Sequence, residues 1–201
     1  MNYQRHDLVW LEPAGSYPPA LSHWLTNGYP CVIPRQDVAA GLQLKVAWSL
    51  PRDKSAAGRL AVMIDSRRVV RHQSPLPLVI LNQLGIAIDS LSAEFQQLGI
   101  GVGVFGSFAW HYLTGNEYIH QGSDIDLLLA IKTAQQLQRL PDLLQSLAEI
   151  SQRRIDGEIC FPNGQAVAWR EWFSSSEELL VKSINNIEII GRDKLIQQIN
   201  D

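Results

Sequence analysis

A glycine-serine pair in the middle of the chain separates two apolar segments of different character. Residues 102–105 form a short apolar run, Gly106 and Ser107 follow, and residues 108–113 form an apolar run with helical spacing. This order predicts a strand, a tight turn and a helix. Glycine lets backbone approach a ligand closely, and a helix N-terminus presents unpaired N–H groups and a positive dipole end to an anion. With Ser107 as helix cap and hydroxyl donor, the sequence predicts a phosphate-binding turn.

Two aspartates follow this turn, just ahead of an apolar run. Asp124 and Asp126 are one residue apart and precede the three leucines at 127–129. Because side chains alternate along a strand, both carboxylates are expected on the same face. An isolated Asp-X-Asp is commonly a solvated strand end, and an isolated Gly-Ser is commonly only a helix cap. In this order and on these elements, the two together indicate a site for Mg²⁺-bridged phosphates.

The same residues resemble the motif of the nucleotidyltransferase superfamily, which is Gly-Ser at a helix start followed by Asp-X-Asp on the next strand. Within it, residues 106–118 (Gly-Ser-Phe-Ala-Trp-His-Tyr-Leu-Thr-Gly-Asn-Glu-Tyr) and 123–128 (Ser-Asp-Ile-Asp-Leu-Leu) are similar to the phosphoribosyl-dephospho-CoA transferases, the holo-acyl-carrier-protein synthases of malonate decarboxylase. Further similar blocks span nearly the whole chain, at residues 5–11, 156–158, 166–171 and 179–182.

This resemblance implies a fold and a reaction. The implied fold is α+β, with a nucleotidyltransferase-like mixed sheet and helices over residues 76–201 and a small β-rich N-terminal domain over residues 1–75. The implied reaction moves the phosphoribosyl-dephospho-CoA group of 2′-(5″-triphosphoribosyl)-3′-dephospho-CoA to a serine of the apo acyl carrier protein of malonate decarboxylase, with release of pyrophosphate.

Two alternative functions stay open. One is an ATP-dependent nucleotidyltransferase that acts on another protein or on a small molecule. The metal-site residues would contact only the triphosphate, which both donors share, so they do not distinguish the two reactions. The other is a non-catalytic carrier-protein-binding module that kept the fold. The intact Asp-X-Asp counts against that module, since close like charges are unfavourable without a metal.

A third carboxylate is expected near the first two, because phosphoryl transfer with two metal ions generally uses one. Asp156 and Glu158 share one face of a strand expected over residues 154–161. We predict Asp156 as this ligand, because the resemblance places Asp-Gly-Glu here and a short side chain at the start of a strand holds a tighter geometry. Glu158 remains the alternative.

Lys182, at the end of another expected strand, is a candidate for neutralising charge on the departing phosphates. An edge-strand lysine that discourages aggregation is an equally good interpretation. The set of site residues, with two Mg²⁺ as expected cofactors, is therefore Asp124, Asp126, Asp156, Gly106, Ser107 and Lys182.

Charge is unevenly distributed along the chain. Residues 1–75 carry nine cations and five carboxylates, a balance of +4, whereas residues 76–201 carry eight cations and 15 carboxylates, a balance of −7, and the two sum to −3. The basic part would suit a polyanionic substrate or an acidic protein partner, although arginines that only aid solubility would look the same. The first candidates for contact with either are Arg52, Lys54 and Arg59. No interleaving of cations and aromatic residues points to nucleic acid.

Proline residues mark the expected domain boundary. Pro75 and Pro77 interrupt any continuous element, so the catalytic domain should begin near residue 76. Beyond the central motif, a capping box at Thr133 should open a leucine-rich helix that Pro141 kinks or divides.

The sequence also bears on the cellular compartment and on membrane association. No apolar run approaches the ~20 residues of a membrane span, and the N-terminus lacks the layout of a signal peptide. Cys31 and Cys160 are too few for a disulfide framework. These features predict a cytoplasmic protein without a membrane partner.

Overall fold

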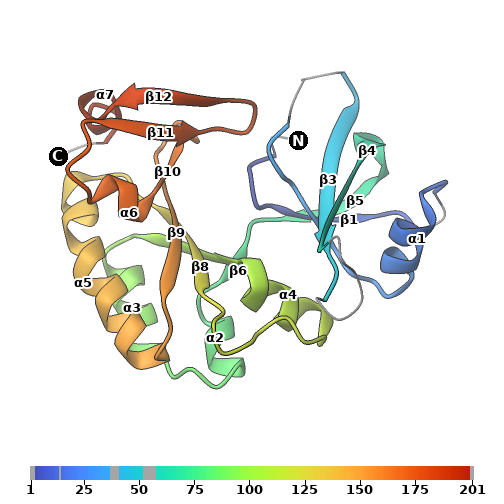
Figure 1. Cartoon of the computed structure of the whole chain (residues 1–201), viewed down its shortest axis with the longest axis horizontal. Helices are drawn as coiled ribbons and strands as arrows, with labels where there is room; N and C mark the ends of the chain where they lie inside the picture. The colour runs from blue at the N-terminus through green and yellow to red at the C-terminus, as the bar shows by residue number, and fades with distance from the viewer. Residues whose placement is uncertain (1–2, 14, 37–40, 52–57, 200–201) are drawn as a thin grey trace.

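The computed structural model describes residues 3–13, 15–36, 41–51 and 58–199, and within them the strands form two sheets (Figure 1). The N-terminal elements are β1 (Leu8–Leu11), α1 (Pro19–Thr26), β2 (Cys31–Val32), β3 (Gln43–Ser49), β4 (Arg59–Asp65), the 3₁₀ helix η1 (Ser66–Arg68) and β5 (Val69–Gln73). The C-terminal elements are β6 (Leu76–Pro77), α2 (Ile80–Gln83), α3 (Asp89–Gln97), β7 (Gly101–Phe105), α4 (Gly106–Thr114), β8 (Ile125–Ala130), α5 (Ala134–Ser151), β9 (Ile155–Cys160), β10 (Ala166–Ala168), α6 (Trp169–Trp172), β11 (Glu178–Lys182), β12 (Ile187–Gly191) and α7 (Arg192–Ile196).

The N-terminal strands make a sheet of their own, in the order β4-β3-β2-β1-β5, and each described pair is antiparallel. Strand β3 shows the alternation that such a sheet requires, because Leu44, Val46 and Trp48 are buried while the residues between them are half exposed. Leu21 and Trp24 of α1 belong to the same buried cluster. The β-rich N-terminal region expected from the sequence is thereby confirmed.

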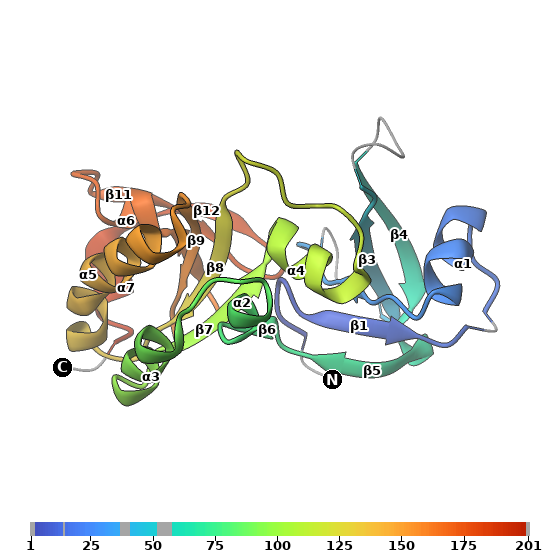
Figure 2. The ribbon, with the colours of Figure 1, turned by 90° about the horizontal axis from the view of Figure 1, so that it is seen from below.

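The second sheet has the order β12-β11-β10-β9-β8-β7-β6 and is mixed. Strands β8 and β9 run parallel, and the other described pairs are antiparallel. Helices α3 and α5 pack side by side against one face, where Ile125, Leu127 and Leu129 of β8 are fully buried (Figure 2). The residues that alternate with them, including Asp126, lie on the opposite face. The α+β fold class is confirmed.

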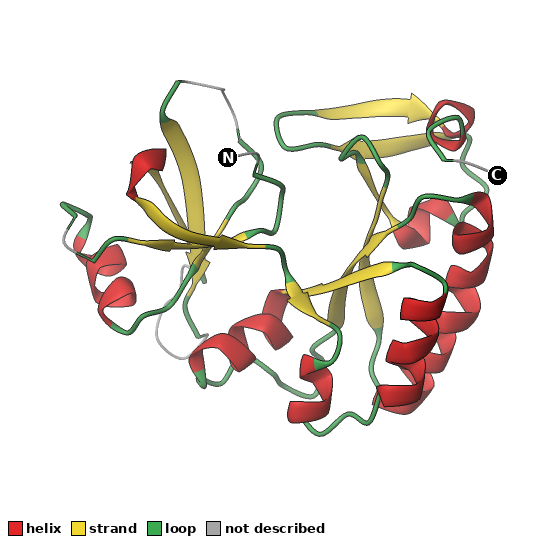
Figure 3. Cartoon of the chain, turned by 180° about the vertical axis from the view of Figure 1, so that it is seen from behind, coloured by secondary structure: helices red, strands yellow, loops and turns green. Residues whose placement is uncertain are grey.

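Helix α4 and the loop that follows it lie between the two sheets (Figures 2 and 3). Trp110 on α4 packs edge-on against Trp24 of α1, with ring centroids 5.5 Å apart. The Tyr29 hydroxyl donates to the Thr114 carbonyl at 3.1 Å, and the Tyr118 hydroxyl donates to the Ser49 carbonyl at 2.6 Å. These contacts hold the N-terminal elements against α4 and the loop that follows it.

The leucine-rich helix α5 differs in part from its prediction. The capping box at Thr133 is present, with the Gln136 N–H donating to the Thr133 hydroxyl. Pro141, however, does not divide the helix, which runs as one element from Ala134 to Ser151. The loss of one backbone hydrogen bond at proline is offset by the buried leucine stripe that docks both halves of the helix.

The predicted domain boundary lies at β6, which already pairs with β7 of the second sheet. The division into domains 1–75 and 76–201 stays a prediction. Within the described residues, no helix is both long and apolar enough to cross a membrane.

Candidate active site

Both the backbone conformation and the neighbouring Asp126 side chain require glycine at position 106. Its φ is +68°, in the left-handed region that side chains with a Cβ seldom adopt. A Cβ at this position would also overlap the Asp126 carboxylate, because Phe105 of β7 pairs with Asp126 of β8. Only glycine therefore lets the turn close against this carboxylate.

Ser107 is placed differently from its prediction. Helix α4 begins at Gly106 with Phe105 in the cap position, and no side-chain hydrogen bond caps it among the residues that the structure describes. The predicted N-cap role of Ser107 is wrong, because β7 runs directly into the helix and leaves Ser107 in the first turn. Ser107 nevertheless lines the same cavity as Gly106, and its contact with phosphate stays a prediction.

Asp126 and Asp156 lie side by side on the neighbouring strands β8 and β9. They are register partners in the parallel β8–β9 pair, so their side chains leave the sheet on the same face. The next partners are Leu127 and Gly157, and a Cβ at Gly157 would overlap the Leu127 backbone. Gly157 therefore lets the two strands approach where the aspartates sit. The Asp156 Oδ1 accepts the Gly157 N–H at 2.9 Å.

Asp124 forms an ion pair with Arg154 just before β8 and β9 begin. The Arg154 Nε donates to Oδ1 at 2.8 Å, and its Nη2 donates to Oδ2. These hydrogen bonds hold the pKa of Asp124 below its usual value. The first aspartate of the motif is thus engaged by a guanidinium, whereas Asp126 and Asp156 adjoin each other.

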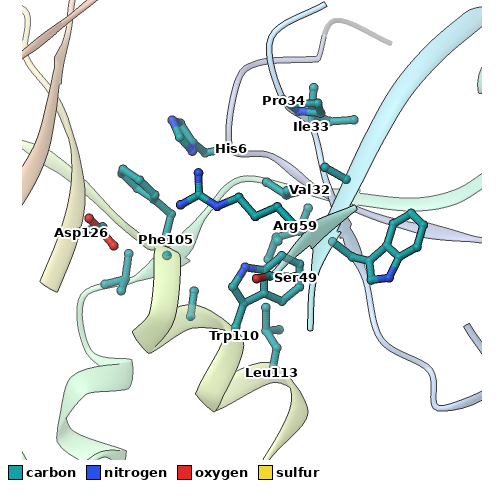
Figure 4. A pocket seen from close by; sticks show the side chains of 16 residues that line it. His6, Val32, Ile33, Pro34, Ser49, Arg59, Phe105, Trp110, Leu113 and Asp126 are labelled. Carbon is teal, nitrogen blue, oxygen red and sulfur yellow. The ribbon is translucent and has the colours of Figure 1, made fainter. Parts of the chain in front are cut away.

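Asp126 is electrostatically strained. Burial, together with the negative charges of Asp156 and Asp124, raises its pKa to about 6. Arg59, on β4 of the other sheet, acts in the opposite direction. Figure 4 shows its side chain crossing the space between the sheets, with the guanidinium near Phe105 and on the Asp126 side.

Glu158 lies on β9, two residues after Asp156, in a second cluster of charged side chains, and it is only 6% exposed. Arg5 donates to its two oxygens at 2.9 and 3.0 Å, and Lys182 donates to Oε1 at 2.9 Å. His6 lies 3.6 Å from Oε2. Burial by itself raises the pKa of Glu158, but the neighbouring His6 and the hydrogen bonds from Arg5 and Lys182 outweigh it and lower the pKa overall.

This cluster bears on two of the sequence predictions. Glu158 would have to give up its cationic partners to bind a metal, so Asp156 remains our prediction for the third carboxylate. Lys182 is held at Glu158, and its contact with phosphates also stays a prediction.

Two adjoining cavities open beside these residues. One, of about 600 Å³, is lined by Gly106, Ser107, Asp124, Asp126 and the loop before β8. The other, of about 250 Å³, lies between the N-terminal sheet and α4 and has largely apolar walls (Figure 4). The residues that line both are Ser49, Arg59, Gly106, Trp110 and Asp126.

The carboxylates beside Gly106 meet the requirements of Mg²⁺ only in part. Across the described parts of the chain, no group of three or more His, Cys, Asp or Glu side chains is arranged to hold a metal ion. Asp126 and Asp156 do offer two neighbouring carboxylates. Mg²⁺ commonly takes one or two carboxylates together with substrate phosphates, so the pair fits an ion that binds with a phosphorylated substrate.

Arg154 and Arg5 were not predicted as parts of the site. The pairing of Ile125 with Ile155 puts Asp124 beside Arg154. A parallel alignment of the two strands that carry the aspartates would therefore have predicted the contact of Arg154 with Asp124. Nothing in the local sequence around Arg5 reveals that it reaches Glu158, 153 positions away.

Comparison with known proteins covers both parts of the chain. Residues 4–75 match the model of the "Phosphoribosyl-dephospho-CoA transferase MdcG N-terminal domain", and residues 74–193 match that of the corresponding C-terminal domain. Relatives named phosphoribosyl-dephospho-CoA transferase include proteins of Xanthomonas campestris pv. campestris (34% identical, over 96% of this chain and 97% of the relative), Pseudomonas putida (33%, over 95% of each) and Bradyrhizobium diazoefficiens (28%, over 96% and 92%).

No solved structure matches the chain. The sequence matches alone therefore carry the assignment, and they extend over nearly the whole length of both this chain and its relatives. The resemblance stated from the sequence is confirmed, and the chain belongs to the phosphoribosyl-dephospho-CoA transferase family, a family of transferase enzymes.

Proposed function

We propose that this transferase moves the phosphoribosyl-dephospho-CoA group from 2′-(5″-triphosphoribosyl)-3′-dephospho-CoA to a serine of the apo acyl carrier protein of malonate decarboxylase. The observation that carries this proposal is the register pairing of Asp126 with Asp156 beside the Gly106 turn, at a cavity that Arg59 also lines. A triphosphate needs this combination of close backbone, carboxylates and a fixed cation. A cytoplasmic location is part of the proposal.

The triphosphate is assigned to the larger cavity. The turn at Gly106 brings backbone N–H groups close to it, and the first turn of α4 adds its positive dipole end and the Ser107 hydroxyl. Arg59 supplies positive charge from the other sheet, where it can offset the charge that develops on the leaving pyrophosphate.

Asp156 is assigned the role of accepting the proton from the serine of the carrier. The serine Oγ of the carrier forms a bond to the α-phosphorus as the bond from that phosphorus to the bridging oxygen breaks, and pyrophosphate leaves with that oxygen. The serine proton passes to the Asp156 carboxylate and on to water. One oxygen of Asp156 already accepts the Gly157 N–H, which orients the carboxylate for this role.

Two Mg²⁺ are the proposed cofactors, held by Asp124 and Asp126, with Asp156 as the third carboxylate. When bound, they would neutralise phosphate charge and stabilise the attacking and leaving oxygens. To bind a metal, Asp124 would have to release Arg154, and it lies only one residue before β8.

The test is a mass measurement on the carrier. Purified enzyme, Mg²⁺, apo carrier and the triphosphoribosyl donor should give a carrier heavier by one phosphoribosyl-dephospho-CoA group, with one pyrophosphate per transfer. A parallel reaction with ATP should leave the carrier unchanged. A carrier that gains AMP from ATP, or no change with either donor, would refute the proposed function.

A further inference from the structure

The apolar cavity between the N-terminal sheet and α4 is not used by the chemistry described above. It measures about 250 Å³ and lies beside the larger, more polar cavity, with which it shares Gly106, Asp126 and Arg59. A ligand that enters both must pass these three residues. Its phosphates would meet the carboxylates and the arginine, and whatever is attached to them would meet the apolar walls.

We propose that this apolar cavity is the binding site for the purine ring of the donor. The assignment rests on the proposed function, in which only the sugar of the adenosine separates the purine ring of the donor from the triphosphate-bearing ribose. Base and triphosphate are therefore close enough in the molecule to occupy adjoining cavities, whereas its flexible pantetheine arm has no need of aromatic walls.

The walls suit a flat aromatic ligand. Trp110 contributes an indole from α4, and it is held in place by Trp24 at 5.5 Å and by Tyr118 at 6.4 Å between ring centroids. Phe105 lies on the other side of the cavity mouth and is stacked on the His6 ring, with centroids 4.0 Å apart (Figure 4). Rings braced in this way can stack on a base without rearranging.

The remaining walls are small or aliphatic and come from both parts of the chain. Ala47 on β3 and Val32 on β2 face Ala109 and Leu113 on α4 across the cavity. A purine placed here would bridge the N-terminal sheet and α4. This placement gives the N-terminal region a function in donor binding, in addition to Arg59.

Filling the cavity tests the proposal. Ala47→Phe places a ring in it from β3, and the matched control Ala61→Phe makes the same change at the exposed register partner of Ala47 on β4, outside the cavity lining. The ligands are 3′-dephospho-CoA, which has the base but no triphosphate, and inorganic tripolyphosphate. Calorimetry gives both dissociation constants, and thermal melts confirm that each variant is folded.

We expect Ala47→Phe to weaken 3′-dephospho-CoA at least tenfold while tripolyphosphate binds as in the wild type and Ala61→Phe changes neither. Trp110→Leu should also weaken 3′-dephospho-CoA about tenfold, and Trp110→Phe should restore most of the loss. The purine assignment is overturned if wild type does not bind 3′-dephospho-CoA, if Ala47→Phe binds it normally, or if Ala47→Phe loses both ligands equally.

The outcome is separable from that of the proposed function. Selective loss of 3′-dephospho-CoA in Ala47→Phe supports the purine site even if no carrier is modified, in which case the acceptor is wrong. Carrier modification with an unchanged donor KM in Ala47→Phe supports the function and overturns the purine site.

Discussion

Asp126 and Asp156 occupy matching positions on neighbouring parallel strands, and Asp156 is followed by a glycine at which a Cβ would overlap the backbone of the other strand. Two carboxylates held side by side in a half-buried position repel each other, and that repulsion contributes to the raised pKa of Asp126. An arrangement of this kind costs stability, and a bound cation would relieve the cost.

The first prediction concerns Asp126. Asp126→Asn should lower kcat by about 10³-fold or more, because losing one metal ligand removes several kcal/mol of transition-state stabilisation. Without Mg²⁺ its melting temperature should equal or exceed that of the wild type, since a repulsive charge is gone. Steady-state kinetics and calorimetric melts provide the measurements, and near-normal turnover would contradict the metal assignment.

The second prediction concerns the guanidinium that now holds Asp124. Arg154→Ala should lower the Mg²⁺ concentration for half-maximal activity by roughly two- to fivefold, because an exposed ion pair is worth up to about 1 kcal/mol. Arg153→Ala is the matched control, as Arg153 donates only to the carbonyls of His120 and Gln121 among its described contacts. If Arg154→Ala leaves the Mg²⁺ dependence unchanged, Asp124 is a partner of Arg154 and not a ligand.

Some features of the site could be predicted from the local sequence and others could not. The need for glycine at 106 and the shared face of Asp124 and Asp126 follow from turn chemistry and strand alternation, which are local properties. The pairing of Asp156 with Asp126 required only that two strands be adjacent. The predicted capping role of Ser107 was wrong because the helix begins one residue earlier than expected. Where it begins depends on where the preceding strand ends, which the local sequence does not show to within one residue.

The arginines could not be placed by the same reasoning. Arg5 and Arg59 reach the site from the N-terminal region, and their positions depend on how that region packs on the second sheet and α4. No periodicity along the chain encodes this packing. Arg59 was a candidate only because the surrounding segment is basic, and that segment, with Arg52 and Lys54, lies outside the described residues.

The third prediction concerns stability. Glu158→Gln should lower the free energy of unfolding by about 2–4 kcal/mol, because it leaves Arg5 and Lys182 half buried without a counter-charge. Turnover per folded molecule should stay within a small factor of the wild type if Asp156 is the third carboxylate. The control Glu94→Gln removes an exposed partner of Arg139 and should cost less than about 1 kcal/mol. Urea unfolding measures both, and lost turnover in stably folded Glu158→Gln would favour Glu158 as the ligand.

The fourth prediction concerns Arg59. Arg59→Met should reduce kcat/KM for the donor by about 10²-fold, because it removes a cation from the triphosphate cavity and from developing charge on pyrophosphate. Arg67→Met is the control, since Arg67 is an exposed arginine near the far end of β4 whose charge is paired with Asp65. Unaltered donor kinetics in Arg59→Met would remove this residue from the site.

The last prediction concerns the carrier. The acidic C-terminal part of this chain, with a balance of −7, would repel an acidic carrier, whereas residues 1–75 carry +4. Because Arg59 lines the donor cavities, we assign steering of the carrier to the other two candidate cations, Arg52 and Lys54. Steering acts mainly on the association rate and is screened over a Debye length of ~10 Å at 0.1 M salt.

Charge reversal at both positions, Arg52→Glu with Lys54→Glu, should therefore lower kcat/KM for the carrier and flatten its dependence on salt. The KM for the donor should stay unchanged, which separates this pair from Arg59. Stopped-flow association at several ionic strengths measures the effect directly. If donor binding weakens instead, these cations contact phosphates and the carrier docks elsewhere; if neither changes, the charge asymmetry serves only solvation.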